Sequence, residues 1–372
     1  MNGEGTVLLQ GIVPWAQLNT TQHRMAHALH RAGWRCLYLE PRRPGLWARG
    51  REPRSPEVPL TRERLPGLPS RVVERLPPGW VLDPVLRAVQ VRPLWLYLTS
   101  GRPRHLRLGE ELQWRLMPER TTFEVWDLPE PGAREAVAAA VARVDAAWVV
   151  DRAMDTTGQG LPEVPNAADA PLAAPAPEPG VPILGFCGSI NAWLDLELLL
   201  AATAVEGCRL EIIGAPFGLS AEARALWRRL LGEPGVRWLG PLPYVEAARR
   251  MQGWTLGLLP RNRSAGAQES CPLKILEYLA AGLPCVGSHR GAAERYPDVC
   301  LFAEGPQAFA EACRIGVETH GQLAARCRGY AARWTWDRRL ESIRALVGGA
   351  ERTGGGGSAP GESGNPNRSR GR

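Results

Sequence analysis

The sequence predicts an α/β protein of two domains that face each other across a cleft. Short apolar runs with the length of buried parallel strands alternate with helical segments over residues 1–170, and the alternation returns over 182–333. A proline-rich stretch at 171–181 separates the two halves and has the composition of a stiff linker. Since 372 residues can bury two cores, we expect each half to be a Rossmann-like domain.

The first domain is expected to open with a strand, a helix and a second strand. ThrValLeuLeuGlnGlyIleVal (6–13) predicts a buried strand, and residues 21–32 predict an amphipathic helix capped by Thr20 or Thr21. CysLeuTyrLeu (36–39) predicts the next strand. No G-x-G-x-x-G follows the first strand, which disfavours a dinucleotide-binding dehydrogenase.

The rest of the first domain mixes irregular and regular segments. Residues 41–79 are dense in proline and arginine and predict an irregular, exposed insertion. The segments expected after it are a short helix at 80–90, strands at 94–98 and 122–126, a helix at 133–142 and a strand at 146–150. Asp127 follows one of these strands, at the carboxyl end where parallel sheets bind ligands. A ligand-facing role and a helix-capping role both stay open for it.

The second domain is expected to open with a strand that ends in a turn of small residues. ProIleLeuGlyPheCysGlySerIle (182–190) contains both, and Gly188 and Ser189 at the turn allow backbone N–H groups to approach a pyrophosphate. The later elements are expected as strands at 209–214, 236–240 and 254–260 and a helix at 244–251. The tail at 348–372 lacks apolar periodicity, which predicts disorder.

The most informative stretch, residues 269–290, predicts a loop, a helix and a strand. A proline suits the first helical turn, and a glycine followed by a proline ends the helix. Lys274 lies in that first turn, where unpaired N–H groups and the helix dipole favour a phosphate. Glu277 shares a helix face with Lys274 and can accept two hydrogen bonds from a vicinal diol such as a ribose. Glu269 can do the same from the preceding loop.

A simpler interpretation of the same helix is a solvated face stabilised by ion pairs. Lys274 argues against it, because it is the one lysine in a chain whose other basic residues are all arginine. A compact ammonium with three donors suits a diphosphate. We therefore favour a phosphate-binding site.

The spacing E-x7-E between Glu269 and Glu277, with the run from Leu273 to Val286, resembles the donor site of family 4 glycosyltransferases. These are retaining enzymes of the GT-B fold that use nucleotide-activated sugars. ValProAsnAlaAlaAsp (164–169) resembles the segment that closes the first domain in this family, and the helix expected at 334–347 resembles the one that crosses back to it. The resemblance thus extends over nearly the whole chain.

The resemblance implies a role for particular residues of this chain. Those implied are Glu269, Lys274 and Arg261 in catalysis, Glu277, Gly188, Ser189, Leu273 and Tyr244 in donor binding, and Trp15 and Asp127 on the acceptor side. The implied partners are a nucleotide sugar as co-substrate and an acceptor that is a glycan, a lipid-linked saccharide or a small molecule. No metal and no further cofactor are implied.

The chain departs from the family in two places. Many members carry an arginine and a lysine soon after the first turn of the second domain, whereas this chain has no basic residue there until Arg209. The diphosphate would then rely on Lys274 and Arg261, with Arg263 as a near rival. Where the family often has a histidine near the reacting carbon, this chain has ThrSerGly at 99–101. A nucleotide-sugar-binding scaffold without transferase activity therefore stays open, and so does an epimerase of the same fold.

Composition bounds the compartment and the partners. The eight cysteines form no C-x2-C pair and lie mostly in apolar runs, which predicts reduced thiols without disulfide or zinc. We expect a cytoplasmic protein, because no apolar segment has the length of a membrane span and no signal peptide is evident. Up to Arg107 there are ten more arginines than acidic residues. No nucleic-acid-binding motif accompanies them, so an anionic membrane or a phosphorylated acceptor is favoured, with a compositional bias of the source as the alternative.

We predict that the first domain binds anionic membranes peripherally. Each arginine near such a surface contributes about 1 kcal/mol, and added salt screens the attraction. Co-sedimentation with anionic vesicles should fall with salt and with charge reversal of arginines between Arg42 and Arg107. Deletion of the tail after Gly348 should leave it unchanged. Equal binding to neutral and anionic vesicles would contradict the prediction.

Overall fold

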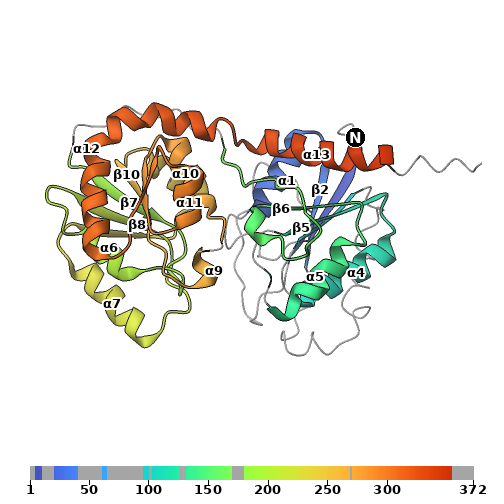
Figure 1. Ribbon diagram of the computed structural model, residues 1–372, viewed down its shortest axis with the longest axis horizontal. Coiled ribbons are helices and arrows are strands. Elements are labelled where there is room, and N and C mark those ends of the chain that lie inside the picture. The colour runs from blue at the N-terminus through green and yellow to red at the C-terminus, as the bar shows by residue number, and fades with distance from the viewer. Residues whose placement is uncertain are drawn as a thin grey trace, which may run out of the picture.

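A computed structural model describes residues 5–10, 21–40, 61–64, 95–99, 103–125, 129, 131–169, 180–268 and 270–353. Two α/β domains lie side by side, as predicted, each with a parallel sheet covered by helices (Figure 1). The predictions for Trp15, residues 80–90, Asp127 and Glu269 lie outside the described residues.

The first domain contains a six-stranded parallel sheet in the order β3-β2-β1-β4-β5-β6. Its strands are β1 (Thr6–Gln10), β2 (Arg35–Glu40), β3 (Thr61–Arg64), β4 (Trp95–Thr99), β5 (Arg120–Val125) and β6 (Ala146–Val149). The strands β1 and β4 are buried along their whole length, as apolar runs between two helical layers should be.

Helices cover both faces of this sheet and define two apolar clusters. They are α1 (Thr21–Arg31), α4 (Pro103–Leu116), α5 (Arg134–Val141), the short helices η1 (Pro131–Ala133) and η2 (Arg152–Met154), and the C-terminal α13 (Trp336–Thr353). One cluster joins α1 and α13 to the sheet, and the other joins α4 and α5 to its opposite face. The last helix of the chain is thus part of the first domain.

The second domain repeats the design with the strand order β12-β11-β10-β7-β8-β9. Its strands are β7 (Ile183–Cys187), β8 (Arg209–Ile213), β9 (Val236–Gly240), β10 (Leu256–Leu259), β11 (Cys285–Gly287) and β12 (Cys300–Phe302). If the strands β7 to β12 are numbered 1 to 6, their order is 3-2-1-4-5-6, which is also the order of the first sheet. In both sheets the order reverses beside the first strand, and ligands of such folds bind at the carboxyl ends of the strands flanking that point.

The helices of the second domain form the second pair of layers. They are α6 (Leu196–Ala202), α7 (Ala221–Gly232), α8 (Tyr244–Met251), α9 (Ala265–Gln268), α10 (Leu273–Ala281), α11 (Arg290–Arg295) and α12 (Pro306–Ala331). An apolar cluster joins α6, α7 and α12 to one face of the sheet, and another joins α8, α10 and α11 to the other face. The helix α10 ends where expected, at Gly282, whose φ of 80° is left-handed and therefore suits glycine.

Three local predictions for the first domain were incomplete or wrong. The segment predicted as an irregular insertion contains the edge strand β3, which pairs with β2 despite its polar sequence. The helix α4 was missed, because arginine, glycine and glutamate interrupt its apolar spacing. The helix α13 continues to Thr353, past Gly348 where a disordered tail was predicted, because its apolar positions still meet the first-domain core up to Val347.

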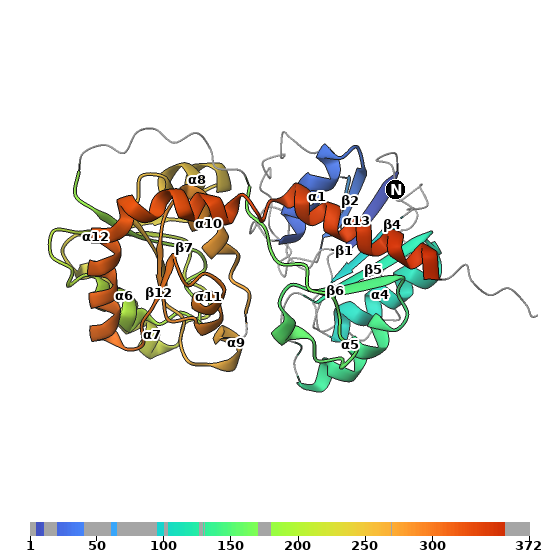
Figure 2. The ribbon, with the colours of Figure 1, turned by 45° about the horizontal axis from the view of Figure 1, so that its top comes forward.

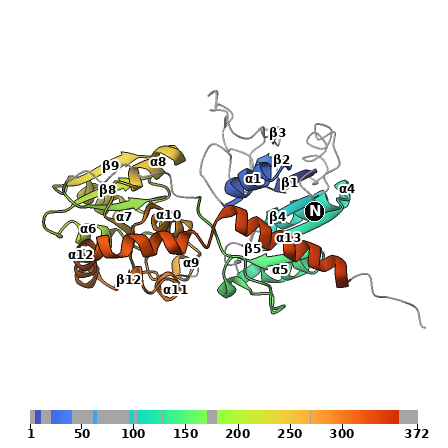
Figure 3. The same cartoon turned by 90° about the horizontal axis from the view of Figure 1, so that it is seen from above.

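The crossing from α12 to α13 ties the C-terminus to the first domain. The two helices are consecutive, yet α12 lies on the second domain and α13 on the first (Figures 2 and 3). Arg339 of α13 forms an ion pair with Glu124 of β5, and the two side chains are 2% and 1% exposed. Tyr97 donates its hydroxyl to the same carboxylate at 2.5 Å, and Nε of Arg339 donates to the Pro165 carbonyl at 2.8 Å.

We predict that Arg339→Met destabilises the first domain by about 3 to 5 kcal/mol, because it leaves the carboxylate of Glu124 buried without its counter-charge. The measurement is the urea midpoint followed by tryptophan fluorescence. Arg338→Met is the matched control, since Arg338 is exposed on the same helix and its loss should cost no more than about 0.5 kcal/mol. Equal midpoints for the two variants would show that the ion pair does not hold α13 in place.

Candidate functional site

The amine of Lys274 occupies the space that the missing side chain of Gly188 leaves. Its Nζ lies over the ring of Phe186, 4.6 Å from the ring centroid. A Cβ at position 188 would lie 2.2 Å from that Nζ, and the φ of Gly188 is +150°. Both the contact and the backbone conformation therefore require glycine. The turn after β7 therefore packs directly against the first turn of α10.

The sequence predicted that backbone N–H groups of this turn approach a pyrophosphate, but two of the amides donate to backbone carbonyls instead. The N–H of Gly188 donates to the carbonyl of Ile213 at 2.9 Å, and the N–H of Ile190 donates to Ala215 at 3.1 Å. These two donors therefore do not face a phosphate. Ser189 lies between them and is half-buried. What Gly188 contributes is room for the lysine.

Arg261 provides a second positive charge beside Lys274. It follows β10, where Ser288 clamps its backbone by accepting from the N–H at 2.7 Å and donating to the carbonyl at 2.6 Å. Its guanidinium lies 5.8 Å from the ring centroid of Trp193. Burial and, after it, the charge of Arg261 lower the pKa of Lys274 to about 7. Two cations at a poorly solvated place favour a bound anion, because an anion relieves their repulsion.

Glu277 lies one turn further along α10 and faces a groove between the domains. The groove has a volume of about 270 Å³ and is lined by residues of α1, α8 and α10. Burial raises the pKa of Glu277, while the charges of Arg24 and Lys274 oppose the rise. Tyr244, the first residue of α8, lines the same groove. Burial and the nearby carboxylate of Glu277 raise the pKa of the Tyr244 hydroxyl.

Several contacts hold the start of α10 against the first domain. The side chain of Asn166 accepts from the Thr21 hydroxyl at 3.0 Å and donates to the Cys271 carbonyl at 3.1 Å. Leu273 packs against the first-domain core, so the structure places this predicted donor-binding residue in the domain interface. Arg295 adds ion pairs from α11 to the first domain, with Asp151 at 3.0 Å and with Glu163 at 2.5 Å.

The sequence did not point to His289, which orders the loop before α10. Its Nδ1 accepts from the N–H of Ala292 at 3.0 Å, so its Nε2–H donates to the Ser270 carbonyl at 2.9 Å. Burial, above all, lowers the pKa of this imidazole. The signal was a histidine directly after a strand at the carboxyl edge of the sheet, where it caps α11.

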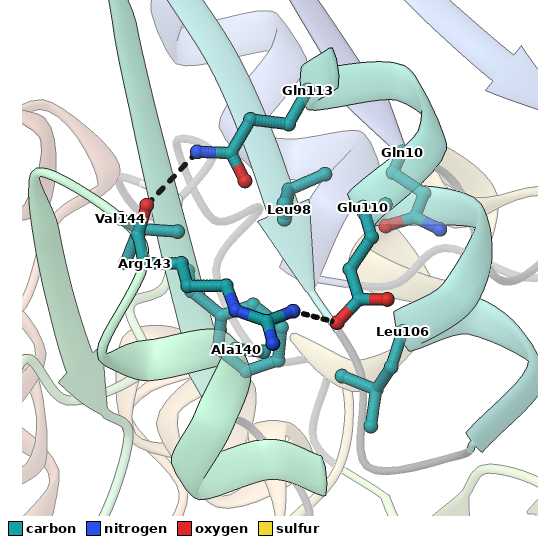
Figure 4. A pocket seen from close by; sticks show the side chains of 10 residues that line it. Gln10, Leu98, Leu106, Glu110, Gln113, Ala140, Arg143 and Val144 are labelled. Carbon is teal, nitrogen blue, oxygen red and sulfur yellow. Dashed lines mark hydrogen bonds and ion pairs between the residues drawn. The ribbon is translucent and has the colours of Figure 1, made fainter.

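A second hollow lies in the first domain, between α4 and α5 (Figure 4). Arg143 and Glu110 form an ion pair at its mouth, and Gln113 donates to the Arg143 carbonyl at 2.9 Å. Its volume of about 10 Å³ is that of one water molecule. It is therefore not a substrate site.

Among the residues that the structure describes, no three His, Cys, Asp or Glu side chains gather closely enough to hold a metal ion. None of the helices found there is both long and apolar enough to cross a membrane.

We predict that Lys274 titrates with a midpoint near pH 7 in the free protein. Since it is the one lysine, isotope-labelled lysine gives a single NMR signal for its ε-carbon. Arg261→Met should move the midpoint upward, because it removes a neighbouring positive charge. Arg263→Met is the control, since Arg263 is exposed and lies 4.0 Å from Glu304. A wild-type midpoint near the ordinary value for lysine would show that the amine is solvated.

Comparisons with known proteins agree with this architecture. Residues 181–317 match the family model described as "Glycosyl transferases group 1". The putative teichuronic acid biosynthesis glycosyltransferase TuaH of Bacillus subtilis is 28% identical over 175 residues, which are 45% of this chain and 43% of that protein. The chain thus matches less than half the length of this relative.

Solved structures extend the likeness to the whole fold. HepE of Anabaena, in complex with UDP and glucose, has a TM-score of 0.69 at 14% identity, covering 93% of this chain and 100% of that one. Sucrose-phosphate synthase of Thermosynechococcus elongatus has a TM-score of 0.70 at 14% identity, covering 94% and 100%. The predicted GT-B fold is confirmed. The family match lies within the second domain, and the structural neighbours extend the shared GT-B fold to both domains.

Proposed function

We propose that this chain is a retaining glycosyltransferase that transfers a sugar, hexosyl in type, from a nucleotide-sugar donor to an acceptor. The observation that carries the proposal is that two positive charges, those of Lys274 and Arg261, lie close together beside Gly188. Glu277 lies one helical turn from Lys274. A diphosphate at the two cations would place its ribose toward Glu277. This is the chemistry that the sequence motif predicted for these residues.

The cations would serve the departing nucleotide. When the bond between the sugar and the diphosphate breaks, negative charge grows on the diphosphate, and Lys274, Arg261 and the start of α10 stabilise it. Glu277 would hold the ribose, and Glu269 the hydroxyls of the donor sugar. The proposal includes no metal and no further cofactor.

The printed names of the relatives suggest where to look for substrates. TuaH is described as a teichuronic acid biosynthesis enzyme, and HepE was solved with UDP-glucose. We therefore propose UDP-glucose as the first donor to test and a saccharide acceptor of a polysaccharide or glycoconjugate pathway. A cytoplasmic enzyme that visits anionic membranes would meet such acceptors in lipid-linked form.

A nucleotide-sugar-binding protein without transferase activity is the second candidate. One observation favours it: Thr99, at the carboxyl end of β4, begins the segment that replaces the histidine frequent in the family. A screen of nucleotide sugars by thermal shift, followed by a donor-hydrolysis assay, separates the two. Stabilisation without turnover supports the binding protein, and turnover supports the enzyme.

We predict that Lys274→Ala lowers turnover about a hundredfold, more than it weakens donor binding, because the charge it stabilises is greatest in the transition state. Wild-type donor affinity should fall as the pH rises above about 7. In that range free Lys274 has lost its proton, and a bound diphosphate, which raises its pKa, must take one up. The measurements are steady-state kinetics and calorimetry at several pH values. Unchanged turnover in a folded Lys274→Ala protein would remove this residue from the mechanism.

A further inference from the structure

Arg24 reaches from the first domain into the groove that contains Glu277. It lies on α1, and its guanidinium carbon is 3.1 Å from the centroid of the Tyr244 ring on α8. Nη1 of Arg24 lies 2.8 Å from the carboxylate of Asp169, at the end of the first domain. One face and one nitrogen of the guanidinium are therefore held in place.

Its other terminal nitrogen is buried but unsatisfied. Nη2 of Arg24 has no hydrogen-bond partner among the residues that the structure describes, although the side chain is only 11% exposed. A buried guanidinium N–H without an acceptor is costly. If Arg24 served only to join the domains, Asp169 and Tyr244 would suffice, and Nη2 would have no role. The free donor points to a ligand oxygen.

The groove supplies the complementary group. Glu277 lines it together with Arg24, and of the neighbouring positive charges that of Arg24 acts most strongly on the Glu277 carboxyl. A hydroxyl group both donates and accepts, so one that donates to Glu277 can accept from Arg24. A vicinal diol fits a carboxylate and a guanidinium better than a phosphate does, because a phosphate would face the negative charge of Glu277.

We propose that Arg24 is the ribose-binding residue of the first domain, donating from Nη2 to the hydroxyl oxygens that Glu277 holds from the second domain. This inference rests on the proposed function and deepens it. Nucleoside binding would then draw on both domains, whereas the diphosphate contacts at Lys274 and Arg261 belong to the second domain alone. The ribose would link donor binding to the closed arrangement of the two domains.

The test compares ligands that have and lack the ribose hydroxyls. Calorimetry with UDP, ADP and GDP identifies the nucleoside diphosphate that wild-type protein binds best, and its 2′,3′-dideoxy form and pyrophosphate serve as probes. Arg24→Met should weaken the intact nucleotide about tenfold to a hundredfold, the value of a hydrogen bond to a charged group. It should leave the dideoxy nucleotide and pyrophosphate within about twofold, since neither uses the lost donor. Glu277→Ala should show the same selectivity.

Two further variants sharpen the result. Arg24→Lys keeps the charge but loses the planar fork, so it should still weaken the intact nucleotide selectively, and it serves if Arg24→Met folds poorly. Arg35→Met is the matched control, because Arg35 lies in the same domain at the start of β2, is exposed and does not line the groove. It should leave all affinities unchanged.

The outcomes separate this inference from the proposed function. Wild-type binding with equal losses for all three probes in Arg24→Met would make Arg24 a domain contact and overturn the inference alone. An unaffected intact nucleotide would do the same. If wild-type protein binds none of the nucleotides, the proposed function fails and the inference fails with it.

Discussion

The structure of the site depends on placing the positive charge of Lys274 where little water reaches it. Burial disfavours an ammonium, and the charge of Arg261 disfavours it further, so the lysine holds its proton weakly. Gly188 makes this arrangement possible, because any side chain there would occupy the position of the amine. The backbone approaches just as closely at a second glycine: a Cβ on Gly214 would lie 1.9 Å from the carbonyl oxygen of Gly188. Neither Gly188, in the turn after β7, nor Gly214, directly after β8, can therefore carry a side chain.

The interface between the domains meets this site at the start of α10. Asn166 bonds both to α1 and to the backbone just before α10, and Leu273 is anchored in the first-domain core. Arg24 of α1 lines the same groove as Glu277. A movement of one domain would therefore change the surroundings of the lysine and the carboxylate together. In proteins of this architecture such coupling can exclude water when the substrate is bound.

The C-terminal helix limits how far the domains can separate. It continues from α12 of the second domain, yet its ion pair with Glu124 lies in the core of the first. Both partners are buried, and the hydroxyl of Tyr97 and the Pro165 carbonyl add a hydrogen bond to Glu124 and to Arg339, respectively. Removing one partner of such a buried pair is costly, so α13 stays attached to the first domain. Any motion of one domain relative to the other must then occur where the chain crosses between the domains.

Local signals in the sequence determined much of this protein. Local signals were sufficient to predict most strands, the helix α10 and the two-domain class, because they act over a few residues. These signals are the apolar runs, the proline at the start of α10 and the glycine at its end. The single lysine, with its spacing to Glu277, indicated the phosphate and ribose roles now proposed. Only the tertiary structure decided which distant residues join them. The contacts of Arg24 with Asp169 and Tyr244 join segments far apart in the chain, so no local pattern could predict them. The strand β3 and the helix α4 escaped prediction for the same reason: their polar or interrupted sequences are stabilised by the neighbouring sheet rather than by their own pattern.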